Sequence, residues 1–271
     1  MKHEIYFAHA NSFPATVYQK MLGYLARQSE VGFIDTIGHN IAFPVTDCWP
    51  YLVDETLHYI RQHYNTPIVG VGHSLGGLLM VYAAIKQPQL FKAIIVLDSP
   101  LVRPSRSFAI WAAKRLRVIH HFTPGGNTLR RRDSWADETM VYDYFARKPL
   151  FARFDPDCLM DYALHGTVPS LDGKGRKLKF RPVIEHSIYC TLPHNLPKFK
   201  NKLQVPAAFI VGSESNVLSP ADLAWIQKHF THVLDTQAGS HLFPLEKPCE
   251  TAERILDWIP RLVEDRSVLF S

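Results

Sequence analysis

The chain has 271 residues, 46% of them hydrophobic, and this composition excludes a chain that is disordered throughout. Its length suits one large core, or a core domain with a sizeable insertion. The formal net charge of +5 comes from 30 basic and 25 acidic residues, with much of the basic excess between Arg103 and Arg132. Because this excess is local, the charge gives no indication of nucleic-acid binding.

The cysteines and the N-terminal residues bear on metal content and compartment. The four cysteines, Cys48, Cys158, Cys190 and Cys249, form no Cys-x-x-Cys pair and have no matching histidine spacing. We therefore expect free thiols and no metal site. The N-terminus lacks the apolar stretch of a signal peptide, and no segment offers the roughly 18 apolar residues of a membrane span. These features predict a cytoplasmic protein without stable membrane insertion.

Six short apolar runs alternate with helical patterns along the chain. They are Ile5 to Ala8, Val31 to Ile34, Ile68 to Val71, Ala93 to Leu97, Ala207 to Val211 and His232 to Leu234. Such βαβ alternation is typical of a parallel sheet. The sequence therefore predicts an α/β fold with a mostly parallel sheet of about six strands flanked by helices, followed by a terminal helix over residues 250–263.

The alternation breaks after the fourth run. Residues 99–204 have a mostly helical pattern rich in aromatic side chains, namely Phe108, Trp111, Trp135, Tyr142, Tyr144, Phe145, Phe151 and Phe154. We interpret this segment as a helical cap inserted into a core formed by residues 1–98 and 205–271. Within the cap, the stretch from Gly173 to Lys177 predicts an exposed turn, because two glycines and three cations have little reason to be buried.

A serine motif follows the third run. The segment Gly72-His73-Ser74-Leu75-Gly76-Gly77 lies between that run and a helical pattern. Gly-x-Ser-x-Gly is short enough to occur by chance, so its context carries the argument. A sharp strand-to-helix turn needs small residues on both sides, so that a strained serine can project its hydroxyl above the sheet. This context favours Ser74 as a nucleophile over an ordinary glycine-rich helix start.

A serine nucleophile requires a base within hydrogen-bond reach, and the loop after the last strand supplies it in this topology. His241 has this placement, since it follows the sixth run and precedes the terminal helix. We interpret His73 and His9, by contrast, as structural residues that support the turn and the first loop. For the oxyanion, we expect the backbone amides of Leu75 and Asn11 to act as donors.

Three segments together resemble the α/β-hydrolase superfamily, which contains esterases, lipases and C–C bond hydrolases. They are the loop His9 to Pro14, the motif Gly72 to Gly77 and the segment Gly239 to Pro248. The resemblance covers roughly residues 1–98 and 205–271, whereas the insertion resembles only generic helical caps. One departure is that the family usually has two strands before the oxyanion loop, so this sheet is expected to be trimmed to six.

The second departure concerns the acid of the catalytic triad. Many members carry it after the strand that follows the cap, but here that stretch has no aspartate and Asn216 stands in its place. Some members place the acid at the end of the strand after the nucleophile helix, which favours Asp98. Glu214 is an alternative because its longer side chain could reach from the other loop. A charge-free dyad assisted by Asn216 is a third possibility.

The resemblance implies a serine hydrolase that cleaves carboxylic esters with small to medium acyl or aryl groups through an acyl-enzyme. Its partner would be an apolar small-molecule ester in a pocket closed by the cap aromatics, with no cofactor. One alternative is a C–C bond hydrolase of the same fold. Another is a non-catalytic ligand-binding protein on a hydrolase scaffold. The stretch from Arg130 to Arg132 suggests an anionic substrate as a further hypothesis, and the oligomeric state stays open.

Overall fold

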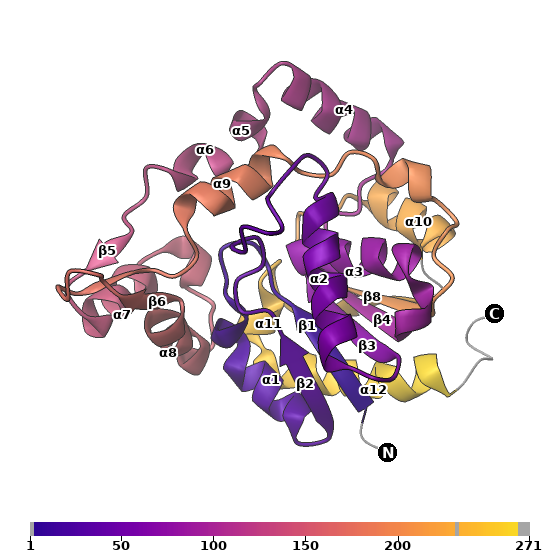
Figure 1. Cartoon of the computed structure of the whole chain (residues 1–271), viewed down its shortest axis with the longest axis horizontal. Helices are drawn as coiled ribbons and strands as arrows, with labels where there is room; N and C mark the ends of the chain where they lie inside the picture. The colour runs from indigo at the N-terminus through magenta and orange to yellow at the C-terminus, as the bar shows by residue number, and fades with distance from the viewer. Residues whose placement is uncertain (1–2, 231–232, 265–271) are drawn as a thin grey trace.

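The core of the protein is a six-stranded parallel sheet in the order β2-β1-β3-β4-β8-β9 (Figure 1). The computed structural model describes residues 3–230 and 233–264. The strands of this sheet are β1 (His3–Ala8), β2 (Ser29–Phe33), β3 (Ile68–His73), β4 (Phe91–Leu97), β8 (Ala207–Gly212) and β9 (Val233–Gln237). The predicted α/β fold is confirmed, although His232, which we expected to begin the last strand, lies outside the described residues.

Helices cover both faces of the sheet, and the strand sequences explain why. In β1, Ile5 and Phe7 face one hydrophobic cluster while Tyr6 and Ala8 face the other, as expected for side chains that alternate along a strand. The helices on the first face are α1 (Gln19–Ala26) and α12 (Pro248–Val263), and those on the second are α2 (Pro50–His63), α3 (Leu75–Lys86) and α10 (Pro220–His229). None of the helices in the described ranges is long and apolar enough to cross a membrane.

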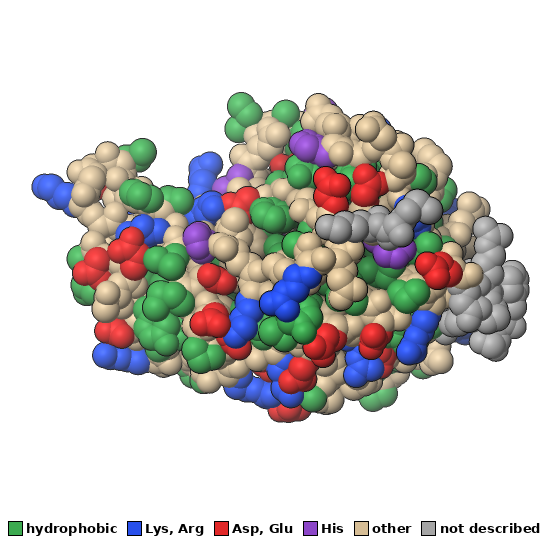
Figure 2. Space-filling view, turned by 90° about the horizontal axis from the view of Figure 1, so that it is seen from below, with side chains coloured by type: hydrophobic (Ala, Val, Ile, Leu, Met, Phe, Trp, Pro, Cys, Tyr) green, Lys and Arg blue, Asp and Glu red, His purple; other side chains and the backbone are tan. Residues whose placement is uncertain are grey.

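The segment between β4 and β8 adds helices above and beside the core (Figure 1). They are α4 (Pro104–Arg115), α5 (Ile119–Phe122), α6 (Gly125–Thr128), α7 (Glu138–Ala146), α8 (Pro156–His165) and α9 (Pro182–Cys190). The same segment contains the shorter helices η3 (Pro149–Phe151) and η4 (Leu196–Phe199), and the rest of the chain contains η1 (Ala15–Tyr18), η2 (Pro88–Leu90) and α11 (Phe243–Glu246). On the face shown in Figure 2, acidic and basic side chains are interspersed.

The segment between β4 and β8, called the insertion below, also contains a small antiparallel sheet that was not predicted. Its strands, in the order β5-β7-β6, are β5 (Ser134–Trp135), β6 (Thr167–Pro169) and β7 (Arg176–Leu178). Gly173 and Gly175 have positive φ angles of 69° and 97° and lie between β6 and β7, as the predicted turn requires. The predicted exposure is wrong for Arg176, whose side chain is only 13% exposed and whose guanidinium donates to Glu138 and Thr167. These bonds offset the cost of burying its charge.

β1 and α3 approach each other closely at Gly76. A Cβ atom at this position would lie 2.0 Å from the carbonyl oxygen of Ala8. Gly76→Ala should therefore force backbone shifts and lower the free energy of unfolding by roughly 2–3 kcal/mol. Gly23, which is exposed in α1 with nothing within 4 Å of its added Cβ, provides the matched control.

Gly23→Ala should raise the free energy of unfolding by about 0.5–1 kcal/mol, because alanine loses less backbone entropy in a helix. Urea unfolding followed by circular dichroism measures both changes. Equal free energies of unfolding for Gly76→Ala and the wild type would show that the close packing of β1 against α3 is wrong.

Candidate active site

Ser74 occupies the sharp turn between β3 and α3, with a φ of 54° and a ψ of −110°. Non-glycine residues rarely adopt such a conformation, so surrounding contacts must hold it. Its amide donates to the carbonyl of Leu97 at 3.0 Å, and the hydroxyl of Ser99 donates to its carbonyl at 2.5 Å. A Cβ at Gly72 would lie 2.3 Å from the carbonyl oxygen of Gly76, so the turn requires glycine there. The chain thus presents the Ser74 side chain above the sheet.

His241 joins Ser74 to a buried carboxylate. It lies between β9 and α11, and its Nε2 is 3.0 Å from the Ser74 Oγ. Its Nδ1 lies 2.6 Å from Oδ2 of Asp98, which directly follows β4 and has a fully buried side chain. The structure therefore brings Ser74, His241 and Asp98 into one hydrogen-bonded chain at the carboxyl end of the sheet. This edge is where open α/β sheets bind their ligands.

The end of β8 and the loop after it supply two donors that hold the Asp98 carboxylate. The hydroxyl of Ser215 donates to Oδ2 at 2.6 Å, and the amide of Gly212 donates to Oδ1 at 3.1 Å. Ser215 was not predicted, because only carboxylates were considered in this loop and not a hydroxyl that donates to a carboxylate at the end of another strand. Glu214 instead makes a bidentate contact with Arg153, at 2.6 and 3.0 Å. Of the two carboxylates considered, the structure therefore brings Asp98 to His241.

His73 and His9 are buried and hold the loops around the site. The hydroxyl of Tyr18 donates to His73 Nδ1 at 2.8 Å, and His73 Nε2 donates to the carbonyl of His241 at 2.9 Å. These roles require a neutral ring, and burial lowers the pKa of His73 to about 3. His9 accepts from the Ile37 amide at 2.8 Å, and burial lowers its pKa to about 4. Both contact sets agree with the structural roles predicted for these residues.

The residues expected to form an oxyanion hole lie beside Ser74. In the first turn of α3, the amides of Gly76, Gly77 and Leu78 donate to carbonyls of His9 and Ser74. The Leu75 amide has no such acceptor among the described residues, as is usual for the first donors of a helix. Asn11 lies in the facing loop, which contributes to the cavity over Ser74.

A cavity of about 300 Å³ opens over Ser74 and His241. The insertion supplies an apolar wall formed by Phe145, Leu150, Phe151 and Tyr162. Phe145 and Phe151 thus line the cavity as predicted, whereas the prediction is wrong for the other six aromatics, namely Phe108, Trp111, Trp135, Tyr142, Tyr144 and Phe154. The rings of Phe108 and Trp111 lie instead on the exposed surface of α4.

The lining of the cavity also includes an ion pair between Arg131 and Glu185. The two side chains approach to 2.5 Å, and the Glu185 side chain is only 5% exposed. Burial raises the pKa of Glu185, and the guanidinium of Arg131 opposes this shift. Arg132, by contrast, packs over the rings of Trp135 and Tyr144. The basic stretch therefore places one guanidinium at the cavity, and a carboxylate balances its charge.

A parallel sheet with a strained serine between strand and helix is the architecture of α/β hydrolases. A family model described as "Alpha/beta hydrolase family" matches residues 5–254. The chain therefore belongs to the alpha/beta hydrolase family, and it is an enzyme.

Individual relatives are distant. "Abhydrolase domain-containing protein ACTT2-1" of Alternaria alternata is 23% identical over 232 residues, covering 72% of this chain and 84% of the relative. A "Probable alcohol acetyltransferase" of Saccharomyces cerevisiae is 24% identical over 216 residues, covering 77% of this chain and 62% of the relative. Among solved structures, an E-2-(acetamidomethylene)succinate hydrolase superposes with a TM-score of 0.75 at 20% identity, covering 95% of this chain and 91% of that one. At such identities, the solved structure supports the fold alone.

The geometry around His241 predicts different effects for the two carboxylates. Asp98→Asn should reduce kcat for an activated aryl ester by roughly 10⁴-fold, because an amide cannot stabilise the imidazolium by charge and favours the wrong tautomer. Glu214→Gln, which removes a carboxylate bonded to Arg153, should leave kcat within about twofold of the wild type. Steady-state kinetics of the two purified variants measures this difference. Full activity in Asp98→Asn would show that Asp98 is not the acid that supports His241.

Proposed function

We propose that this enzyme is a serine hydrolase that cleaves carboxylic esters with small to medium acyl or aryl groups through an acyl-enzyme. The observation that carries the proposal is the hydrogen-bonded chain from Ser74 through His241 to Asp98, directly beneath a cavity. A serine hydroxyl is a weak nucleophile, and a base at 3.0 Å can remove its proton as it attacks.

In the proposed mechanism, Ser74 Oγ attacks the ester carbonyl while His241 Nε2 takes its proton. The buried Asp98 carboxylate stabilises the imidazolium that forms, and the amides of Leu75 and Asn11 bind the oxyanion. His241 then protonates the leaving alcohol, which departs to leave an acyl group on Ser74. A water molecule, deprotonated by His241, attacks this acyl group and releases the acid.

The cavity walls indicate which ester fits. Phe145, Leu150 and Phe151 form an apolar surface that suits an acyl chain or an aryl ring. Among the polar lining residues, Arg131 is balanced by Glu185, so the cavity gains little net positive charge from this pair. We therefore propose a neutral ester as the substrate and not an anionic one.

An active-site probe tests the catalytic assignment without knowledge of the natural substrate. A fluorophosphonate should form one adduct on Ser74, mapped by peptide mass spectrometry. The labelling rate should fall at least a hundredfold in His241→Ala, because the serine then has no base. A panel of aryl esters, thioesters and vinylogous diketones then identifies the bond that is cleaved.

Two outcomes would overturn the proposal in different ways. Cleavage of a diketone without turnover of any ester would identify a C–C bond hydrolase. A folded chain that forms no adduct and releases a tightly bound ligand unchanged would identify a binding protein on this scaffold.

The charge balance in the cavity predicts how specificity can be changed. Glu185→Gln should leave Arg131 unbalanced and lower KM for a carboxylate-bearing ester about tenfold relative to a matched neutral ester, equivalent to about 1.4 kcal/mol. Glu138→Gln is the matched control, because Glu138 pairs with Arg176 and neither residue lines the cavity. Kinetics with the two esters measures the ratio. Equal changes in KM for both esters would contradict the electrostatic explanation.

A further inference from the structure

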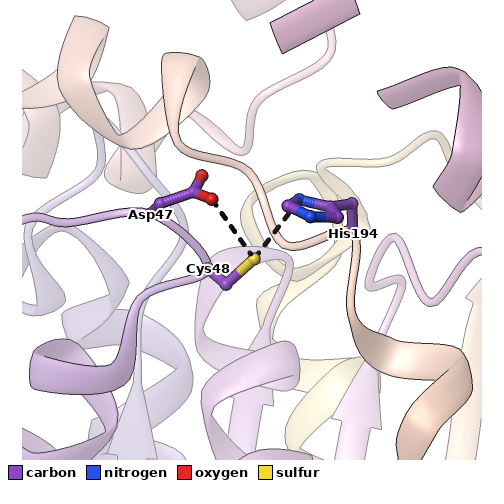
Figure 3. Close-up of side chains that lie close together, drawn as sticks. All are labelled: Asp47, Cys48 and His194. Atoms are coloured by element: carbon purple, nitrogen blue, oxygen red, sulfur yellow. Dashed lines mark hydrogen bonds between the residues drawn. The ribbon is translucent and has the colours of Figure 1, made fainter. Parts of the chain in front are cut away.

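A second group of chemically reactive side chains lies outside the cavity over Ser74. Figure 3 shows Cys48 between Asp47, its neighbour in the loop before α2, and His194 from the segment after α9. The Sγ of Cys48 is 3.3 Å from Nδ1 of His194 and 3.9 Å from Oδ2 of Asp47. One potential ligand atom from each residue lies within 4.8 Å of the other two.

The two separations measured from the Cys48 Sγ are close to the edges of a small coordination tetrahedron. With Zn–S bonds near 2.3 Å and Zn–N or Zn–O bonds near 2.0–2.1 Å, tetrahedral angles place neighbouring ligand atoms about 3.5 Å apart. The distances of 3.3 and 3.9 Å bracket this value. Thiolate, imidazole and carboxylate are also the side chains that zinc prefers, and three protein ligands leave a fourth position for water.

The backbone holds the thiol of Cys48 toward His194. Cys48 and the following Trp49 both have φ angles of 61°, a left-handed conformation that is uncommon outside glycine. The Cys48 amide donates to the carbonyl of Thr191 at 3.0 Å, and the Trp49 indole donates to the hydroxyl of Thr191 at 3.0 Å. Paired residues in this conformation store strain, which clusters at functional sites.

A lysine ammonium already occupies part of this environment. Lys114 of α4 forms an ion pair with Asp47, lies 4.0 Å from the Cys48 Sγ and donates to the carbonyl of Leu192 at 2.9 Å. The group therefore attracts positive charge, and any bound cation must compete with Lys114. Asp47 and Cys48 also line a cavity of about 410 Å³, which provides an entry path.

We propose that Asp47, Cys48 and His194 bind a zinc ion. On binding, the Cys48 thiol loses its proton to solvent, and Lys114 moves away from Asp47. The metal would connect the loop before α2, which belongs to the core, with the segment through which the chain returns from the insertion to β8. Because this site shares no lining residue with the cavity over Ser74, it is distinct from the candidate active site.

Metal titration of the full chain tests the proposal. After treatment with a chelator, the wild type should bind one equivalent of Zn²⁺ by isothermal titration calorimetry. Cys48→Ser and His194→Ala should each weaken binding at least tenfold. Lys114→Met should strengthen it several-fold, because the competing ammonium is removed. Co²⁺ in place of zinc should show the charge-transfer absorption of a thiolate ligand, and Cys48→Ser should abolish this band.

The chain offers a matched control for the cysteine substitution. Cys190 lies 3.4 Å from Nε2 of His186, so it forms a similar thiol–imidazole pair, but it is not part of the three-residue group. Cys190→Ser should leave zinc affinity unchanged. Absence of zinc binding in both the wild type and Lys114→Met would overturn the proposal, as would loss of binding in Cys190→Ser. Thermal unfolding of each variant shows that a lost affinity does not reflect a lost fold.

Discussion

The buried carboxylate of Asp98 is the group on which the geometry of the site depends. A carboxylate without solvent contact is costly unless hydrogen bonds compensate it. Its partners are the Gly212 amide, the Ser215 hydroxyl and the His241 ring. These partners come from the last residue of β8 and from the loops that follow β8 and β9, so satisfying one buried group fixes the positions of two loops relative to β4. The orientation of the His241 ring toward Ser74 follows from this arrangement.

The histidine loop is also held from its other side. Glu246 accepts from the Ser240 amide at 3.0 Å, and its side chain is only 5% exposed. Arg153, in the insertion, lies 3.4 Å from Glu246 and also contacts Glu214. An isolated surface ion pair contributes little to stability, but this pair includes a buried carboxylate that bonds the residue next to His241. Through Arg153 and Glu246, the insertion therefore helps to hold the loop that carries His241, the proposed base.

Local sequence signals predicted the sheet, the serine turn and the position of His241, because each depends on neighbouring residues. Apolar runs and glycine spacing are such signals. The choice between Asp98 and Glu214 depends instead on the path of two loops and on a distant arginine, Arg153, which pairs with Glu214. The strands β5 to β7 were missed because runs of two or three residues show no periodicity. The approach of Cys48 to His194 joins residues 146 positions apart, which spacing rules for metal ligands do not cover.

The insertion is held to the core by contacts of different kinds at separate places. Near α8, Lys20 of α1 lies 2.8 Å from both Asp155 and Asp157. Near the return to β8, Trp49 and Cys48 bond Thr191 through their indole and backbone amide, respectively. Because the second set combines a buried indole with a backbone hydrogen bond, it resists opening more strongly than the ion pairs of Lys20 alone. The α8 side is also held by buried packing, because the Phe13 ring contacts Phe151, Phe154 and Tyr162. Both attachments of the insertion therefore include contacts that water and salt do not reach.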